Sequence, residues 1–218
     1  MKHLVNEMKS FDFYEFTGII TPGCIILAGL IFLYPELQII GDLKNVTIGG
    51  LGIFVILAYA AGHLTQAIGN AIEWLWWKAL GGMPTYWICN KKGSLLSELQ
   101  IKSLEEGLPS KLGLKSTIAL DKITNKEWFA ITRQIYAAVS AHSRSGRIDT
   151  FNGNYGLNRG IASALLIISI LSIIQNQCLW KISLIIFAGA CIALYRMHRF
   201  AKHYARELFV QFLQLPNS

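Results

Sequence analysis

The sequence has little charge, which separates it from ordinary soluble proteins. Asp, Glu, Lys and Arg make up 15% of its 218 residues, whereas a typical soluble domain has about 25%. The hydrophobic share is 53%. Four apolar runs reach or approach the roughly 17 to 25 residues that a helix needs to cross the hydrocarbon of a bilayer. Too few residues remain outside these runs for a large soluble catalytic domain.

The chain also lacks the motifs of metal sites, disulfide frameworks and common catalytic centres. Its four cysteines share no close spacing, so neither a disulfide framework nor a zinc site is expected. There is no glycine loop before a lysine, no helix with paired histidines and no serine elbow. We therefore expect a protein that is not an enzyme and that holds no metal or cofactor.

The apolar runs predict four transmembrane helices, at about residues 17–34, 48–72, 161–174 and 182–195. The first contains Pro22, which bends a helix without preventing it from spanning, and it ends at Tyr34-Pro35. It is predicted to be retained, because no cleavage site for a signal peptide follows it. The second run leads into tryptophans and a lysine that are typical of an interfacial aromatic belt: Trp74, Trp76, Trp77 and Lys78.

Between the second and third runs the sequence predicts two amphipathic helices. One is capped by Ser94 and closed by Gly107 and Pro109. The other begins with a capping box of Thr124 and Glu127, presents one apolar face and reaches about Arg144; the face consists of Trp128, Ile131, Ile135 and Ala138. The glycine- and asparagine-rich piece 146–160 then leads into the third span. A separate closing helix is expected from Arg196 to about Leu213.

The predicted fold is therefore an all-α integral membrane protein with four spans, a helical insert and a basic amphipathic C-terminal helix. Its parts are an N-terminal transmembrane hairpin (1–77), the insert (78–158), a C-terminal transmembrane hairpin (159–195) and the basic helix (196–218). Eighteen of the 20 Lys and Arg lie outside the two short turns. By the positive-inside rule, the insert and both termini face the cytoplasm of a bacterial inner membrane.

A row of polar residues on the second span is the most unusual membrane feature. His63, Gln66, Asn70 and Glu73 recur at spacings of 3, 4 and 3 along one side of the helix. Polar groups at membrane depth are costly unless they meet protein or water. They are predicted either to bond neighbouring helices or to line a water-filled path, and the sequence leaves both readings open.

Basic residues mixed with aromatic ones indicate an anion-binding surface on the cytoplasmic side. Such a mixture suits single-stranded nucleic acid, whose backbone needs positive charge and whose bases need flat faces, but it also suits a segment beside anionic lipid. In the tail, the alternatives are contact with lipid and a ring of charge at the mouth of an oligomer. The candidate ligand residues are Lys91, Lys92, Arg133, Arg144, Arg147, Arg159, Arg199 and Arg206.

The chain resembles a loose group of small bacterial inner-membrane proteins. The resemblance rests on Tyr14-Glu15-Phe16 and Pro22-Gly23 at the start, on Gly62-His63-Leu64 in the second span, and on a layout that covers nearly the whole chain. In outline it is similar to the membrane effector of Hailong-type anti-phage defence, which a nucleotidyltransferase partner controls through short DNA oligomers. The resemblance implies a class of function and assigns no ligand residue.

Together these patterns predict a homo-oligomeric channel or membrane-disrupting effector, gated through its cytoplasmic basic surface by a nucleotide or oligonucleotide. A chain with four spans must recruit copies of itself to enclose a pore, and a tetramer is the expected assembly. The alternative is a non-conducting anchor or scaffold subunit for a cytoplasmic partner. A small transporter is less consistent with the sequence, because no internal repeat is visible. The expected partners are membrane lipids, further copies of the chain and the nucleotide ligand.

Overall fold

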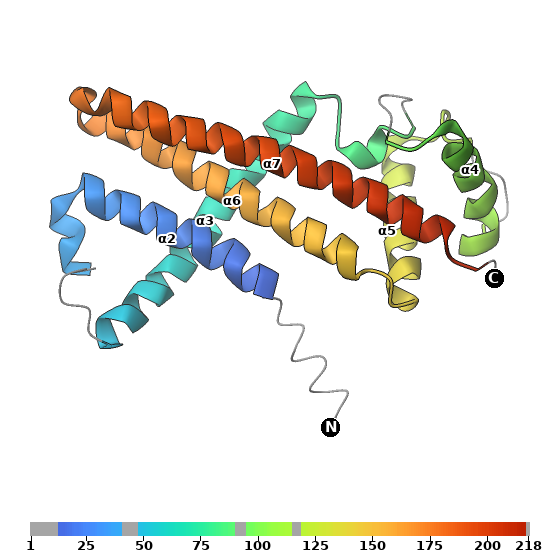
Figure 1. The fold of residues 1–218 in the computed structure, drawn as a ribbon, viewed down its shortest axis with the longest axis horizontal. Coiled ribbons are helices and arrows are strands. Elements are labelled where there is room, and N and C mark those ends of the chain that lie inside the picture. Colours follow the sequence, from blue (N-terminus) through green and yellow to red (C-terminus); the bar gives the residue numbers. More distant parts are fainter. Residues whose placement is uncertain (1–12, 41–47, 90–94, 115–118, 217–218) are drawn as a thin grey trace. The chain divides into compact units, whose positions relative to one another are not determined.

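The computed structural model describes residues 13–40, 48–89, 95–114 and 119–216, and within these ranges it is entirely helical (Figure 1). The α-helices are α2 (Phe13–Leu33), α3 (Ile48–Ala79), α4 (Glu98–Leu112), α5 (Asn125–Ala141), α6 (Gly146–Gln175) and α7 (Trp180–Leu213). Short 3-10 helices lie at η1 (Pro35–Ile40), η2 (Pro84–Tyr86) and η3 (Gln177–Leu179). The all-α prediction is confirmed for the described residues.

Four of these helices, α2, α3, α6 and α7, are long and apolar enough to cross a membrane. The prediction of four helices with the length and apolar composition of membrane spans is thus confirmed. At 1.5 Å per residue, the 32 residues of α3, the 30 of α6 and the 34 of α7 measure roughly 45 to 51 Å. The hydrocarbon core of a bilayer is only about 30 Å thick, so each of the three helices is longer than the membrane requires.

The boundaries of α6 and α7 correct the sequence prediction. Residues 146–160 were expected to form a connection and instead form the first half of α6. A neighbouring segment explains why Gly160 is tolerated, since it lies against Pro22 and Gln66. Asn158 donates its side-chain amide to the carbonyl of Asn154 at 2.7 Å within the helix. The predicted closing helix from Arg196 is likewise the continuation of α7. A change from apolar to basic composition does not break a helix that contains neither proline nor an exposed glycine at that point.

The start and end predicted for α4 are also wrong. Ser94 lies outside the described residues, and the helix is capped by Ser97, whose side chain forms a capping box with Gln100. It passes Gly107 and Pro109 and ends at Gly113, whose φ of 63° is left-handed. A glycine inside a helix costs about 1 kcal/mol. The complete burial of Leu104 and Leu108 on one face outweighs that cost.

Helix α5 follows its prediction closely. Thr124 and Glu127 form the expected capping box, and Trp128, Ile131 and Ile135 are buried, with Ala138 half-buried. The helix ends at Ala141, three residues before the predicted position, because Ser143 has a φ of 57° that an α-helix cannot accommodate.

The chain divides into two compact units. The first, here called the membrane unit, consists of residues 1–76 and 153–198; the second, the basic unit, consists of residues 77–152 and 199–218. Most of the predicted insert and most of the predicted terminal helix thus belong to one unit, which has a single large apolar core. That core includes Leu104, Trp128, Ile135, Phe209 and Phe212.

Candidate functional site

Glycines allow three helices of the membrane unit to approach closely, with α2 and α3 in backbone contact. A Cβ atom on Gly62 of α3 would overlap the carbonyl oxygen of Ile19 in α2, and one on Gly23 would overlap that of Ala58. On α6, a Cβ atom on Gly160 would lie 2.6 Å from Nε2 of Gln66. Small residues that allow close approach are the main device of helix packing in lipid. The crossing of α2, α3 and α6 therefore depends on glycine at these positions.

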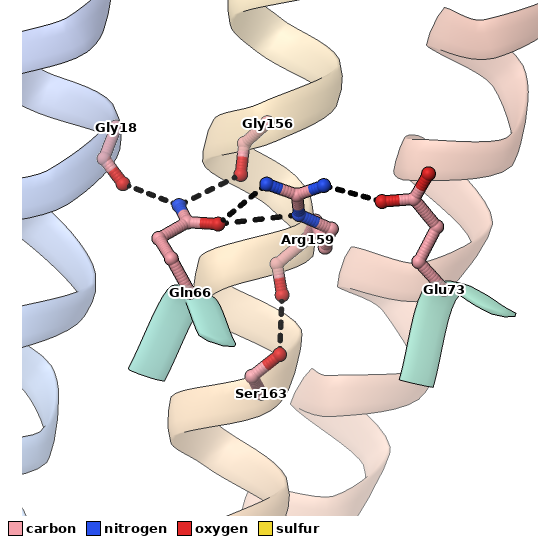
Figure 2. A network of polar contacts seen from close by, with 6 residues as sticks. All are labelled: Gly18, Gln66, Glu73, Gly156, Arg159 and Ser163. Carbon is pink, nitrogen blue, oxygen red and sulfur yellow. Dashed lines mark hydrogen bonds and ion pairs between the residues drawn. The ribbon is translucent and has the colours of Figure 1, made fainter. Parts of the chain in front are cut away.

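Gln66 lies at this crossing and bonds both neighbouring helices (Figure 2). Its Nε2 donates to the carbonyl oxygen of Gly18 on α2 at 2.7 Å and to that of Gly156 on α6 at 3.2 Å. Helical backbones normally keep their carbonyls for internal bonds, but an oxygen has a second lone pair. One amide of α3 thereby joins all three helices.

Arg159 of α6 completes the polar network from the other side. Its Nε and Nη2 donate to Oε1 of Gln66 at 3.2 and 2.9 Å, and its Nη1 forms an ion pair with Oε2 of Glu73 (Figure 2). The side chains of Arg159 and Glu73 are only 21% and 18% exposed. Ser163 donates its hydroxyl to the carbonyl of Arg159 at 2.8 Å. We call Gln66, Glu73 and Arg159 with these backbone partners the polar network.

Electrostatics explain why a charged pair can lie among apolar helices. An unpaired ion that moves from water into a medium of low dielectric constant loses hydration free energy on the order of several kcal/mol. In the polar network the two charges cancel, and all three guanidinium nitrogens have an acceptor. The network therefore bonds α3 to α6 without leaving a net charge between them. Removal of Arg159 or Glu73 would leave the charge of the other without a partner.

The structure divides the predicted polar row into two parts. Gln66 and Glu73 belong to the polar network, whereas His63 and Asn70 are exposed. The helical repeat of 100° per residue places the second pair about 60° around α3 from the first. His63 contacts Tyr59 edge to face, with ring centroids 4.6 Å apart. One half of the row thus bonds neighbouring helices, and the other half points outward.

The candidate ligand residues are also divided. Arg159 lies in the membrane unit and is engaged in the polar network. Lys91 and Lys92 lie outside the described residues. The remaining five are exposed residues of the basic unit, namely Arg133, Arg144, Arg147, Arg199 and Arg206. The assignment of an anionic ligand to these five stays a prediction.

Sequence reasoning missed a buried group of hydroxyls that joins α6 to α7 in the membrane unit. Ser169 donates to the carbonyl of Ser183 at 3.0 Å, and the hydroxyls of Ser172 and Ser183 are bonded to each other. These helices lie side by side and are joined by η3 (Figure 1). The spacing of three between Ser169 and Ser172 in an apolar helix was an available pattern, since such hydroxyls commonly bond across membrane helices.

Among the described residues, no group of three or more His, Cys, Asp and Glu side chains could hold a metal ion.

Comparison with known proteins adds no relative to these observations. No protein-family model matches the chain, and the searches of curated proteins and of solved structures gave no match either.

Proposed function

We propose that this protein is a homo-oligomeric inner-membrane channel or membrane-disrupting effector of bacterial anti-phage defence. We further propose that a nucleotide or oligonucleotide gates it through the basic unit. The observation that carries the proposal is the outward side of α3, where an apolar helix exposes His63 and Asn70.

This outward side needs an environment that one copy of the chain does not supply. An imidazole and an amide facing hydrocarbon would each lose hydrogen bonds to water, at a cost of about 2 to 7 kcal/mol for an uncompensated polar group. In a closed symmetric oligomer each position recurs as a ring, and a ring of polar groups can hold water. Association of α3 with its copies would thus satisfy His63 and Asn70 and supply a wet path across the membrane.

The polar network supports this proposal by fixing the orientation of α3. Gln66 and Glu73 hold one side of the helix against α2 and α6. The side with His63 and Asn70 then points away from the other helices of its unit. A helix held in this way can present a constant surface to neighbouring copies.

The proposed topology places the basic unit and both termini in the cytoplasm, since eighteen of 20 basic residues lie outside the two short turns. A cysteine-free variant with a single cysteine introduced in place of Ser110, or in place of Lys44, tests it in intact cells with an impermeant thiol reagent. We expect labelling at position 44 and protection at position 110. Labelling at 110 from outside would overturn the topology.

Ion flux from proteoliposomes tests the channel. Asn70→Leu and His63→Leu should reduce flux strongly, because a hydrophobic constriction dewets and stops conducting. Ile68→Leu is the matched control, since Ile68 is an exposed apolar residue of the same helix, and it should conduct normally. Size-exclusion chromatography in detergent shows whether each variant still assembles.

Three outcomes separate the competing functions. Assembly without flux in Asn70→Leu supports a pore lined by α3. Loss of assembly in Asn70→Leu means that this side bonds copies together without lining the path. Absence of flux from the wild-type protein, with or without nucleotides, overturns the channel and favours a non-conducting anchor for a cytoplasmic partner.

A further inference from the structure

The start of α6 and the end of α7 bring positive charge together within the basic unit. Phe151 of α6 is stacked on His203 of α7, with ring centroids 5.4 Å apart and planes 29° apart. Arg147 lies over the same Phe151 ring at 5.8 Å. Around His203, the charges of Arg199, Lys202 and Arg206 are close enough to act on its ionisation. We call Arg147, Arg199, Lys202, His203 and Arg206 the basic cluster.

The basic cluster is electrostatically unfavourable by itself. Arg199, Lys202 and Arg206 are three and four residues apart on α7, with His203 between them, and like charges at these spacings repel. His203 lies beyond the apolar part of the helix, and burial together with the neighbouring cations lowers its pKa. Glu207 pairs with Arg147 at 3.7 Å, but within the described residues no carboxylate pairs with Arg199, Lys202 or Arg206. Such an arrangement is stabilised when an anion is added.

The aromatic residues on the same part of the basic unit are already engaged by other side chains. Phe151 contacts His203, Arg147 and Phe200, the last with ring centroids 6.4 Å apart. Tyr136 is half-buried and donates its hydroxyl to Asp149 at 2.7 Å. These rings therefore position cations instead of offering open faces for stacking bases, which is the use that single-strand binding proteins make of aromatic residues.

We infer that the basic cluster is a binding site for phosphate groups that recognises charge and not bases. Two sources share this chemistry, the phosphates of a soluble oligonucleotide or nucleotide and the headgroup of an anionic phospholipid. Arg199 and Lys202 would supply most of the attraction, because Arg147 is paired with Glu207 and Arg206 donates its Nε to the carbonyl of Leu95 at 3.2 Å. The inference rests on the ligand-binding part of the proposed function and makes that ligand's class specific.

The test uses the full chain in nanodiscs of zwitterionic lipid and two fluorescent probes of equal length and charge. One probe is a short thymidylate oligomer, and the other is an abasic deoxyribose phosphate oligomer. We expect the two to bind with affinities that agree within about threefold, because base contacts would contribute more than this. Binding should weaken steeply with salt. The logarithm of the binding constant should fall with the logarithm of the salt concentration, with a slope of about −0.7 for each phosphate neutralised.

Variants of charged residues locate the site. The double variant Arg199→Gln with Lys202→Gln should bind both probes about tenfold or more weakly at low salt. This estimate follows from the usual strength of hydrogen bonds to charged groups. Glu207→Gln should bind them more tightly, because it removes the carboxylate that neutralises Arg147. Lys102→Gln removes an exposed cation whose partner is Glu106 on α4, and it should bind like the wild-type protein.

The outcomes distinguish the two phosphate sources and can overturn the inference. If the soluble probes do not bind, nanodiscs with phosphatidylglycerol are compared, and co-purification of that lipid with the wild type but not with the double variant assigns a lipid headgroup. Much tighter binding of thymidylate than of the abasic probe overturns the inference, as does unchanged binding in the double variant or the absence of every phosphate ligand. Flux through the wild-type protein and Asn70→Leu is measured separately from probe binding, with and without nucleotides, so a failed channel and a failed phosphate site give different results.

Discussion

The membrane unit and the basic unit differ in the kind of contact that stabilises each of them internally. In the basic unit several large apolar side chains, among them Trp128, Phe209 and Phe212, are almost completely buried in one core. In the membrane unit the helices meet through glycines, serines, the polar network and a smaller apolar cluster that includes Ile26, Leu33 and Ile168, while Leu64 and Ile185 are 70% and 72% exposed. Water drives apolar side chains together, but lipid does not distinguish them from its own chains. Each unit is therefore packed for a different solvent.

This difference predicts which substitutions each unit tolerates. The basic unit should be sensitive to the loss of apolar volume and indifferent to most surface polar changes. The membrane unit should tolerate apolar truncation on its outer side and be sensitive to added atoms at glycines and to broken polar pairs.

Truncation of the core tryptophan should have the largest effect on stability. Trp128 stacks on Phe209 with ring centroids 5.8 Å apart and donates its Nε1 to the carbonyl of Thr85 at 2.7 Å. Trp128→Ala should lower the free energy of unfolding by about 3 to 5 kcal/mol. The comparison variant is Leu64→Ala on α3, which should change it little because that side chain meets lipid. Thermal unfolding in detergent measures both, and equal losses would contradict the contrast.

Breaking the ion pair of the polar network should be nearly as damaging. Arg159→Met leaves the Glu73 carboxylate without its partner, and removal of one member of a buried pair costs about 3 to 5 kcal/mol. Adding Glu73→Gln to the same protein removes the stranded charge and should restore most of the loss. The free energies of unfolding of the wild type, the two single variants and the double variant form a double-mutant cycle. If the loss in the double variant equals the sum of the two single losses, the two side chains do not act together.

For the basic unit, the sequence predicted which helices form better than it predicted the residues at which they begin and end. The capping box at Thr124 and Glu127 placed the start of α5 correctly, because both partners lie within four residues of each other. Gly107 and Pro109 were wrong indicators for the end of α4, since tertiary burial of Leu104 and Leu108 overrides local preference. The continuity of α6 was missed because the contact that accommodates Gly160 comes from residues far away in the chain.

The polar network could be predicted only in part for the same reason. A helical repeat indicated that Gln66 and Glu73 need partners, and both are now seen to have one. The identity of that partner, Arg159, depends on how α3 packs against α6, more than 80 residues further along the chain. Arg159 was instead grouped with the cytoplasmic basic residues. Spacing shows which residues share a face, but it does not show which face meets which helix.

Adding one methyl group at the helix crossing should have an intermediate effect. A Cβ atom on Gly62 overlaps the carbonyl of Ile19, whereas one on Gly52 of the same helix meets no atom within 4 Å. Gly62→Ala should therefore lower stability by about 1 to 3 kcal/mol through overpacking. Gly52→Ala, the matched control, should leave stability unchanged or raise it slightly because alanine favours a helix. Equal behaviour of the two variants in thermal unfolding would mean that α2 and α3 do not cross at Gly62.

The smallest predicted effect is the pH dependence that the α5 capping box adds to the basic unit. Glu127 accepts hydrogen bonds from the hydroxyl and the backbone amide of Thr124 at 2.7 and 3.0 Å, and these bonds lower its pKa. A carboxyl group whose pKa is lower in the folded state stabilises that state above its unfolded pKa, here about 4.5. This stabilisation is lost as the pH falls through the folded value.

Glu127→Gln removes the titrating group but keeps an acceptor for the Thr124 bonds. The melting temperature of wild type minus variant should thus be positive near neutral pH and should shrink as the pH falls through the range below about 4.5. In a Thr124→Ala background one of the two bonds is absent, so the same difference should depend less on pH. The cap is local to the basic unit, and no such dependence is expected from contacts made by glycine or serine in the membrane unit. A difference that stays constant with pH would show that the Glu127 carboxylate contributes no charge-dependent bond to the cap.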